Sequence, residues 1–250
     1  MEQRIRVGAV SYLNTRPFIW GLQKSGLMDS IFLVEDYPAS IAMKLQNGEL
    51  DIALLPVAVI PKIDGARIVS QYCIGAESAV ASVAIFSEVP IEQVKTILLD
   101  YQSRTSIALA QILIKEYWKQ NPLWVKANED YIANIKESTA GVIIGDRALQ
   151  QISHYPYVYD LGLAWKNYTG LPFVFAAWVA NKELPATFET SFSQALEWGI
   201  LHIDDLIPQL PAGSYNLNQY FTQNISYPLT DTKKAGLKLF LEKLTQHSIV

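Results

Sequence analysis

Three short polar segments contain the side chains that could bind and transform a small acidic molecule. Residues 11–17 read Ser-Tyr-Leu-Asn-Thr-Arg-Pro, and the Asn14 amide within them can both donate and accept hydrogen bonds. Residues 103–106 read Ser-Arg-Thr-Ser and offer three hydroxyls and a guanidinium, and the third segment is Gly145-Asp146-Arg147. Three of the six arginines in the chain lie in these segments: Arg16, Arg104 and Arg147. Because such donors bind carboxylates and phosphates, the segments predict an anionic ligand.

Each segment also has a simpler structural explanation, which is helix capping. Asn14 or Thr15 could cap a helix that begins at Pro17, and the sequence alone does not separate this role from a ligand contact. In residues 103–106 one hydroxyl would suffice as a cap, so the surplus of donors favours a ligand. Asp146 is a good N-cap residue, and capping is the favoured explanation for it.

A run of small residues at 75–83 would allow a ligand to approach the backbone closely. Ser82 lies within this run. Its side chain could point into a pocket or fill a tight core, because the sequence does not fix which face of a strand a residue occupies. Both roles for Ser82 therefore stay open at this point.

Metal, nucleotide and redox-cofactor chemistry lack their usual sequence motifs. The three histidines are widely separated, and there is no His-Glu-x-x-His or paired Cys-x-x-Cys arrangement. Neither Gly-x-Gly-x-x-Gly nor the P-loop pattern occurs, so we expect no metal and no cofactor. Cys73, the only cysteine, excludes an intrachain disulfide and is read as a small buried hydrophobic residue.

Composition narrows the class of protein and of partner. The chain has 250 residues, of which 50% are hydrophobic and 18% charged, which is typical of a globular protein. The net charge of -4 gives nucleic acid no general electrostatic reason to bind. The longest apolar run, Leu171 to Ala180, is about half the length that a membrane span needs. No secretory signal is evident at the start, so we expect a cytoplasmic protein.

The elements that must position these segments alternate between strand and helix in a first block. Apolar, β-branched runs predict strands at Ile5 to Val10, Ile31 to Val34, Ile52 to Leu55, Ile68 to Ile74 and Val80 to Phe86. Proline at a first-turn position predicts helices at Pro17 to Gln23 and Pro38 to Gln46. Ligands bind beyond the carboxyl ends of strands in open α/β sheets, which is where residues 11–17 lie.

A second alternating block and a helical tail follow. The block contains predicted strands at Thr96 to Leu99, Leu123 to Lys126 and Gly141 to Gly145, and helices at Thr105 to Trp118, Asp130 to Lys136 and Arg147 to Ile152. After a strand at Phe173 to Val179, helices are predicted at Thr187 to Leu206, Leu217 to Gln223 and Thr232 to Gln246. We therefore expect lobe one to comprise residues 1–87 and 176–250, and lobe two to be the insertion 88–175. The chain would cross between the lobes twice, and these two crossings would form a hinge.

Four motifs in order carry a resemblance to a known family. They are residues 11–17, 103–106, Ile144-Gly145-Asp146 and 169–175, the last reading Thr-Gly-Leu-Pro-Phe-Val-Phe. Together they resemble the chorismate dehydratase family of the futalosine route to menaquinone, over residues 5 to 180. The resemblance implies an α/β fold like the type II periplasmic binding proteins, in which two lobes close on a ligand in the cleft between them.

The resemblance also implies an activity and a set of site residues. Chorismate would lose water to give 3-[(1-carboxyvinyl)oxy]benzoate, in a hydro-lyase reaction that needs no cofactor and is the first step of the futalosine pathway. The family's active-site asparagine falls on Asn14, and its active-site serine falls on Ser82. The expected substrate-binding residues are Ser11, Tyr12, Thr15, Pro56, Val57, Ser103, Arg104, Thr105, Ser106, Gly145 and Asp146.

A mechanism follows as a hypothesis. Residues 103–106 could hold one of the two carboxylates of chorismate, so replacing Arg104 by Ala is expected mainly to raise KM. The base that removes the C3 proton could be Asp146, Glu77 or the substrate's own enolpyruvyl carboxylate, and we favour the last. Asn14 and Ser82 would then hydrogen-bond the leaving hydroxyl or that carboxylate.

Two other classes of protein share this architecture. A solute-binding protein for a small carboxylate would bind without catalysis, and a ligand-sensing regulator domain would need a DNA-binding segment that the sequence does not show before its first strand. The sequence leaves open whether the chain is a monomer or a homodimer. Incubation with chorismate separates a dehydratase from a solute-binding protein, because a binding protein leaves chorismate intact.

Overall fold

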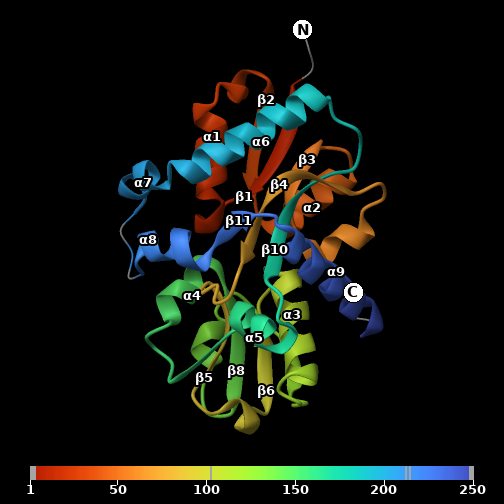
Figure 1. The fold of residues 1–250 in the computed structure, drawn as a ribbon. Helices are drawn as coiled ribbons and strands as arrows, with labels where there is room; N and C mark the ends of the chain where they lie inside the picture. Colours follow the sequence, from red (N-terminus) through yellow and green to blue (C-terminus); the bar gives the residue numbers. More distant parts are fainter. Residues whose placement is uncertain (1–3, 102, 212, 214, 248–250) are drawn as a thin grey trace.

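The computed structural model describes residues 4–101, 103–211, 213 and 215–247. Two mixed β-sheets form two lobes, one above the other in Figure 1. The strand order is β11-β4-β10-β3-β1-β2 in the first sheet and β7-β6-β8-β5-β9 in the second. This is the two-lobed α/β architecture that the sequence predicts.

The first lobe begins with the alternating block that was predicted. Its elements are β1 (Ile5–Val10), α1 (Arg16–Lys24), β2 (Ile31–Asp36), α2 (Pro38–Gln46), β3 (Ile52–Pro56) and β4 (Arg67–Ala76). β1 lies between β2 and β3 and pairs parallel with both. Every residue of β3 is buried, as expected for a strand covered on both faces.

The second lobe is built on a sheet with both parallel and antiparallel pairs. Its elements are β5 (Val83–Ser87), β6 (Thr96–Leu99), α3 (Arg104–Glu116), β7 (Leu123–Lys126), β8 (Thr139–Ile144), α4 (Gly145–Gln151), β9 (Tyr157–Asp160) and α5 (Leu161–Thr169). Strand β9 and helix α5 were not predicted. The helix predicted at Asp130 to Lys136 is only the 3-10 turn η5 (Tyr131–Asn134).

The remaining chain returns to the first lobe. Its elements are β10 (Phe173–Ala180), α6 (Ala186–Leu201), α7 (Ile203–Leu206), α8 (Leu217–Gln219), the π turn η7 (Tyr220–Asn224), β11 (Ser226–Pro228) and α9 (Asp231–Gln246). The helix predicted at Leu217 to Gln223 is therefore a short α turn followed by a π turn. β11 pairs antiparallel with β4, and it escaped prediction because it is three residues long and contains a proline.

Helix α6 packs against α1 backbone to backbone. A Cβ atom at Gly21 would lie 1.9 Å from the Ala195 carbonyl oxygen, and one at Gly199 would lie 1.9 Å from the Pro17 oxygen. Only glycine fits at these two positions, so the pair fixes α6 against the helix that follows β1. Through α1, this contact also supports the loop that contains Asn14.

The chain crosses between the lobes at residues 77–82 and again at 170–172. Our sequence-based boundaries placed residues 83–87 in lobe one, but β5 pairs with β8 and β9 of the second sheet. β10 begins at Phe173, three residues before the boundary that the sequence suggested, and pairs within the first sheet. We therefore propose that the lobes divide at these two crossings.

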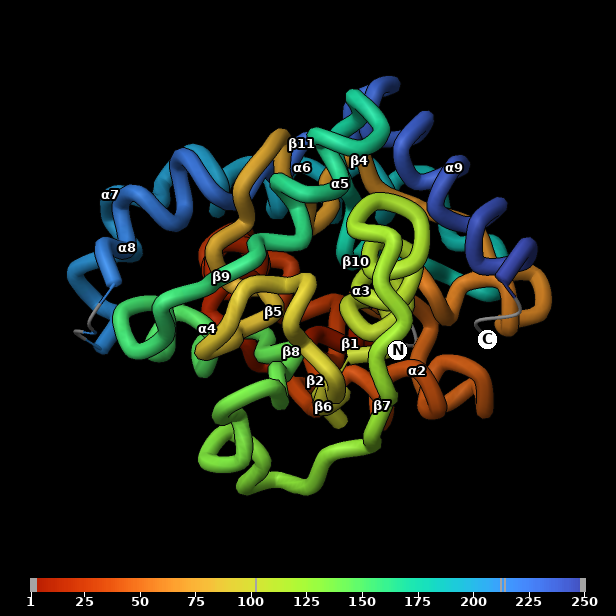
Figure 2. Tube along the Cα trace, turned by 90° about the horizontal axis from the view of Figure 1, so that it is seen from below, coloured from red at the N-terminus to blue at the C-terminus, as the bar shows by residue number. Residues whose placement is uncertain are grey.

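Helix α9 reaches across to the second lobe. In Figure 1 and in the end-on view of Figure 2 it runs beside α3, and the two helices are in contact. The Glu116 carboxylate at the end of α3 pairs with Lys243 and His247 of α9. The tail therefore contacts both lobes rather than only the first.

Candidate active site

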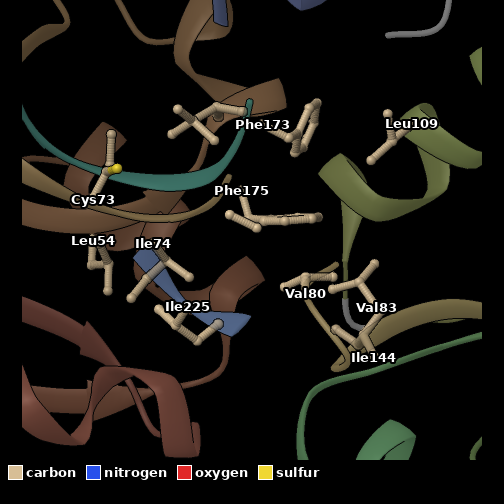
Figure 3. Packing of buried hydrophobic residues seen from close by; sticks show 14 of the residues in the cluster. Leu54, Cys73, Ile74, Val80, Val83, Leu109, Ile144, Phe173, Phe175 and Ile225 are labelled. Carbon is tan, nitrogen blue, oxygen red and sulfur yellow. The ribbon is translucent and has the colours of Figure 1, made fainter. Parts of the chain in front are cut away.

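A cavity lies between the two lobes, at the carboxyl ends of β1 and β3. The space inside it that admits water-sized spheres is about 70 Å³, and the whole hollow, with the solvent at its mouth, is about 580 Å³. Figure 3 shows its apolar wall, with Leu54 and Ile74 of the first lobe facing Val83 and Ile144 of the second, and Phe175 between them. The polar side chains that line it come from three loops: Tyr12, Asn14, Thr15, Ser82, Ser103 and Ser106.

Asn14 lies in the 3-10 turn η1 (Leu13–Thr15), which is separated from the end of β1 by two residues. Thr15 is the N-cap of α1, but no side chain makes a capping bond there. The Asn14 side-chain oxygen accepts from the Thr15 hydroxyl at 3.3 Å, and the Asn14 carbonyl accepts from the Tyr227 hydroxyl at 3.1 Å. The capping explanation for this loop is therefore wrong, and the Asn14 amide lines the cavity.

Ser82 lies in a turn before β5, because the strand begins at Val83 and not at Val80 as predicted. Ala81 adopts a left-handed conformation, with φ of 62°, and the Asp160 carboxylate accepts from its N–H at 2.7 Å and from that of Val80 at 3.1 Å. The Ser82 carbonyl accepts from Gly145 N–H at 2.7 Å. Asp160 thus holds the turn in a strained shape that brings fully buried Ser82 to the cavity.

Residues 103–106 divide their roles at the start of α3. The Ser103 hydroxyl caps the helix by accepting from Ser106 N–H at 3.1 Å, and it donates to the Ser106 hydroxyl at 2.9 Å. Both serines line the cavity. The Thr105 hydroxyl points elsewhere and accepts from Ala58 N–H of the first lobe at 3.1 Å. Thr105 therefore joins the lobes and does not line the cavity.

None of the three junction arginines lines the cavity. Arg104 is exposed, because it occupies the first helical position of α3, on the side away from the buried serines. Arg16 pairs with Glu35 at 3.2 Å, and Arg147 pairs with the buried Asp100 carboxylate at 2.7 Å. The Arg104 guanidinium, which we expected to hold a carboxylate, therefore lies outside the lining, and hydroxyl, amide and backbone N–H groups are the donors there.

Gly145 and Asp146 also have distinct positions. Gly145 lines the cavity with φ of 63°, and the Tyr12 ring lies 3.6 Å from where its Cβ would be. The Asp146 side chain does not cap α4. Instead it accepts from Leu13 N–H at 3.2 Å across the lobe interface, and burial raises its pKa. Our N-cap assignment for Asp146 is therefore wrong, and the residue links the two lobes beside the cavity.

The other predicted residues divide between the lining and its surroundings. Tyr12 and Pro56 line the cavity, and burial followed by the nearby Asp100 charge raises the pKa of the Tyr12 phenol. Ser11 is exposed, and Val57 is buried in the core of the first lobe, so neither lines it. Among the residues that the structure describes, no lining side chain is charged at neutral pH.

Comparisons with known proteins place the chain in a family. The family model described as menaquinone biosynthesis matches residues 5–246, almost the whole chain. The chain belongs to this family. A chorismate dehydratase of Thermus thermophilus is 24% identical over 262 residues, covering 95% of this chain and 94% of the relative.

Solved structures show that this member of the menaquinone biosynthesis family has the fold of binding proteins. A structural-genomics protein from Archaeoglobus fulgidus aligns with a TM-score of 0.76 at 14% identity, covering 100% of this chain and 99% of the other. The periplasmic aliphatic sulphonate binding protein of Escherichia coli aligns with a TM-score of 0.60 at 14% identity, covering 100% and 94%. These likenesses confirm the two-lobed architecture.

Sequence reasoning missed the contribution of the tail to the site. Tyr220 is fully buried, and its hydroxyl donates to Ser82 Oγ at 2.9 Å, while Tyr227 holds the Asn14 carbonyl. No spacing in the sequence connects these tyrosines to residues 138 or more positions away. The one signal in the sequence was residue type: tyrosine combines an apolar ring with a polar hydroxyl, and both tyrosines lie in a tail that was predicted to be helical.

The described part of the chain contains neither a metal-binding cluster nor a membrane-spanning helix. No group of three or more histidine, cysteine or acidic side chains there could hold a metal ion. Among the same residues, no helix has the length and apolar character needed to cross a membrane.

Proposed function

We propose that this protein is a chorismate dehydratase that converts chorismate to 3-[(1-carboxyvinyl)oxy]benzoate and water without a cofactor. One observation carries the proposal: Asn14 of the first lobe and Ser82, at the end of the crossing to the second lobe, line one uncharged cavity, together with further hydroxyl groups. Family membership and the relative from Thermus thermophilus support the choice of substrate. In the same proposal, the reaction opens the futalosine-dependent route to menaquinone.

The start of α3 is suited to one carboxylate of chorismate. The Ser103 and Ser106 hydroxyls line the cavity there, and the first turn of a helix presents backbone N–H groups at the positive end of its dipole. Helix α3 has 13 residues, enough for this dipole to develop. The ring carboxylate would be held without a guanidinium, by hydroxyl and N–H donors.

The chemistry then requires a base and a polarised leaving group. Of the protein carboxylates considered from the sequence, Asp146 is engaged with Leu13 N–H outside the lining, and Glu77 is exposed and pairs with Lys233 at 3.3 Å. The enolpyruvyl carboxylate of the substrate itself would therefore take the C3 proton. The C3–H electron pair forms the ring double bond, the C4–O bond breaks, and the hydroxide leaves with that proton as water.

Asn14 and Ser82 assist where charge develops. Their N–H and O–H groups would donate to the departing C4 oxygen, and donors placed at a developing charge lower the barrier most in a site closed to water. The product ring is aromatic, so the reaction is strongly downhill, and positioning with charge stabilisation suffices.

A direct assay tests the proposal. Purified protein is incubated with chorismate in buffer with a chelator and no added nucleotide, and the mixture is followed by mass analysis and by the absorbance of the diene. We expect loss of one water from the substrate. Chorismate that binds but keeps its mass would contradict the proposal and favour a solute-binding protein.

A further inference from the structure

The tail makes a buried contact with Ser82. This contact has no role in the mechanism described so far. The Tyr220 hydroxyl donates to Ser82 Oγ at 2.9 Å, and both side chains have no exposed surface. Burial raises the pKa of Tyr220, and the neighbouring Ser82 and Asn14 side chains only partly oppose this effect. The phenol therefore stays protonated, and remains a donor, throughout the physiological pH range.

The direction of this bond decides what Ser82 can do. A serine hydroxyl has one proton and two acceptor sites, and the phenol of Tyr220 occupies one of the acceptor sites. The other partner within reach, the Val80 carbonyl, is 3.5 Å from Ser82 Oγ, longer than an ordinary O–H···O bond. Ser82 donates its proton along this long bond, so a ligand in the cavity that Ser82 lines can draw the proton away at little cost.

The tail holds the same turn at a second point. The Asn224 side chain donates to the Ala79 carbonyl at 3.1 Å and accepts from the Tyr215 hydroxyl at 3.0 Å. The Tyr215 ring also packs edge-on against Tyr220, with centroids 6.1 Å apart. Tyr220 and Asn224 are the two ends of the π turn η7, a rare conformation that often occurs at functional sites.

We propose that Tyr220 is a positioning residue. Its phenol donates to Ser82 Oγ and fills an acceptor site there, so that the serine donates its only proton to the C4 hydroxyl that chorismate loses. The inference rests on the proposed function and adds a residue to it. Tyr220 does not line the cavity, so it acts through Ser82 and not on the substrate.

The test is Tyr220→Phe, which keeps the buried ring and removes only the hydroxyl. We expect kcat to fall about tenfold, while KM and the affinity for the product, measured by calorimetry, stay within about twofold. Tyr155→Phe is the matched control. Tyr155 is half-buried and donates to the Ile132 carbonyl at 3.2 Å, and it does not line the cavity, so kcat should be unchanged.

A double variant separates positioning from general structural damage. In a Ser82→Ala background the phenol has no serine to orient, so adding Tyr220→Phe should lower kcat no further. Unchanged kcat in the single variant, or an equal loss in the two backgrounds, would overturn the inference while wild-type turnover still supports the proposed function. A wild-type protein that leaves chorismate intact would overturn both.

Discussion

The tail meets the second lobe at two places, and the two contacts differ in kind. At Ser82 the contact is a neutral hydrogen bond from Tyr220, with no exposed surface, beside the cavity. At Glu116 it is ionic: the carboxylate pairs with Lys243 and His247 and accepts from the Tyr168 hydroxyl at 2.5 Å. The first contact lies beside the proposed chemistry and the second lies on the outside of the lobes.

The same division holds across the molecule. Charged side chains join the lobes or cap elements around the cavity, as Asp160 and Asp146 do, while amides and hydroxyls line it. A dianionic substrate in this pocket keeps its own carboxylate reactive, because no described lining residue is a lysine or arginine that would neutralise it. The comparison therefore predicts large kinetic effects at neutral residues and effects on stability at charged ones.

The largest effect is expected for Asn14 and Ser82, the two candidate catalytic residues of the cavity. Asn14→Ala or Ser82→Ala should lower kcat about 100-fold with a small change in KM, because each removes a donor whose bond strengthens in the transition state. Steady-state kinetics with chorismate measure both constants, and thermal unfolding checks that the fold survives. Wild-type turnover in Asn14→Ala would refute its assignment.

A smaller effect is expected at Asp160, whose carboxylate holds the turn that contains Ser82. Asp160→Asn replaces one of two acceptor oxygens by an N–H₂ group, which then faces either the Val80 or the Ala81 N–H group. We expect a loss of about 2 kcal/mol in the free energy of unfolding, measured with urea, and a lower kcat. Asp231→Asn, at an exposed position at the start of α9, is the control and should change neither quantity. A stable and fully active Asp160→Asn enzyme would contradict the role of this turn.

The ionic contact predicts an effect of pH on stability. Burial raises the pKa of Glu116, but hydrogen bonds from Lys243, Tyr168 and His247 more than offset it and lower the pKa to about 2. Since this lies below the ordinary value of 4.5, the carboxylate stabilises the folded state above pH 4.5, and the contribution is lost as pH falls toward 2.

Glu116→Gln tests that effect. We expect a loss of about 1–2 kcal/mol at pH 7 and a weaker dependence of stability on pH between about 5 and 2, followed by chemical denaturation. The kcat for chorismate should stay within about twofold, since Glu116 lies outside the cavity lining. A large loss of kcat without loss of stability would remove the distinction between the two contacts.

The smallest effect is expected at Arg104. The sequence alone suggested that Arg104→Ala would raise KM, but the structure exposes this side chain outside the cavity lining. We now expect KM to stay within about twofold of wild type. A tenfold rise in steady-state KM would return Arg104 to the carboxylate site.

The sequence was informative where function follows local chain geometry. Asn14 and Ser103 lie in the segments that link β1 and β6 to the helices that follow them, and the rule that ligands bind at the carboxyl ends of strands places both at the cavity. Arg104 and Ser103 are adjacent, yet only the serine lines the cavity, because the phase of a helix decides which neighbour points inward. Tyr220 could not be predicted, since its contact with Ser82 depends on how the tail packs.

The most direct test of the central claim is a crystal structure of the Asn14→Ala/Ser82→Ala double variant with chorismate bound. The account predicts the ring between positions 14 and 82, one carboxylate hydrogen-bonded to Ser103 and Ser106, and the enolpyruvyl carboxylate beside C3. A ring bound outside this cavity, or Asp146 or Glu77 within hydrogen-bonding distance of C3, would contradict it.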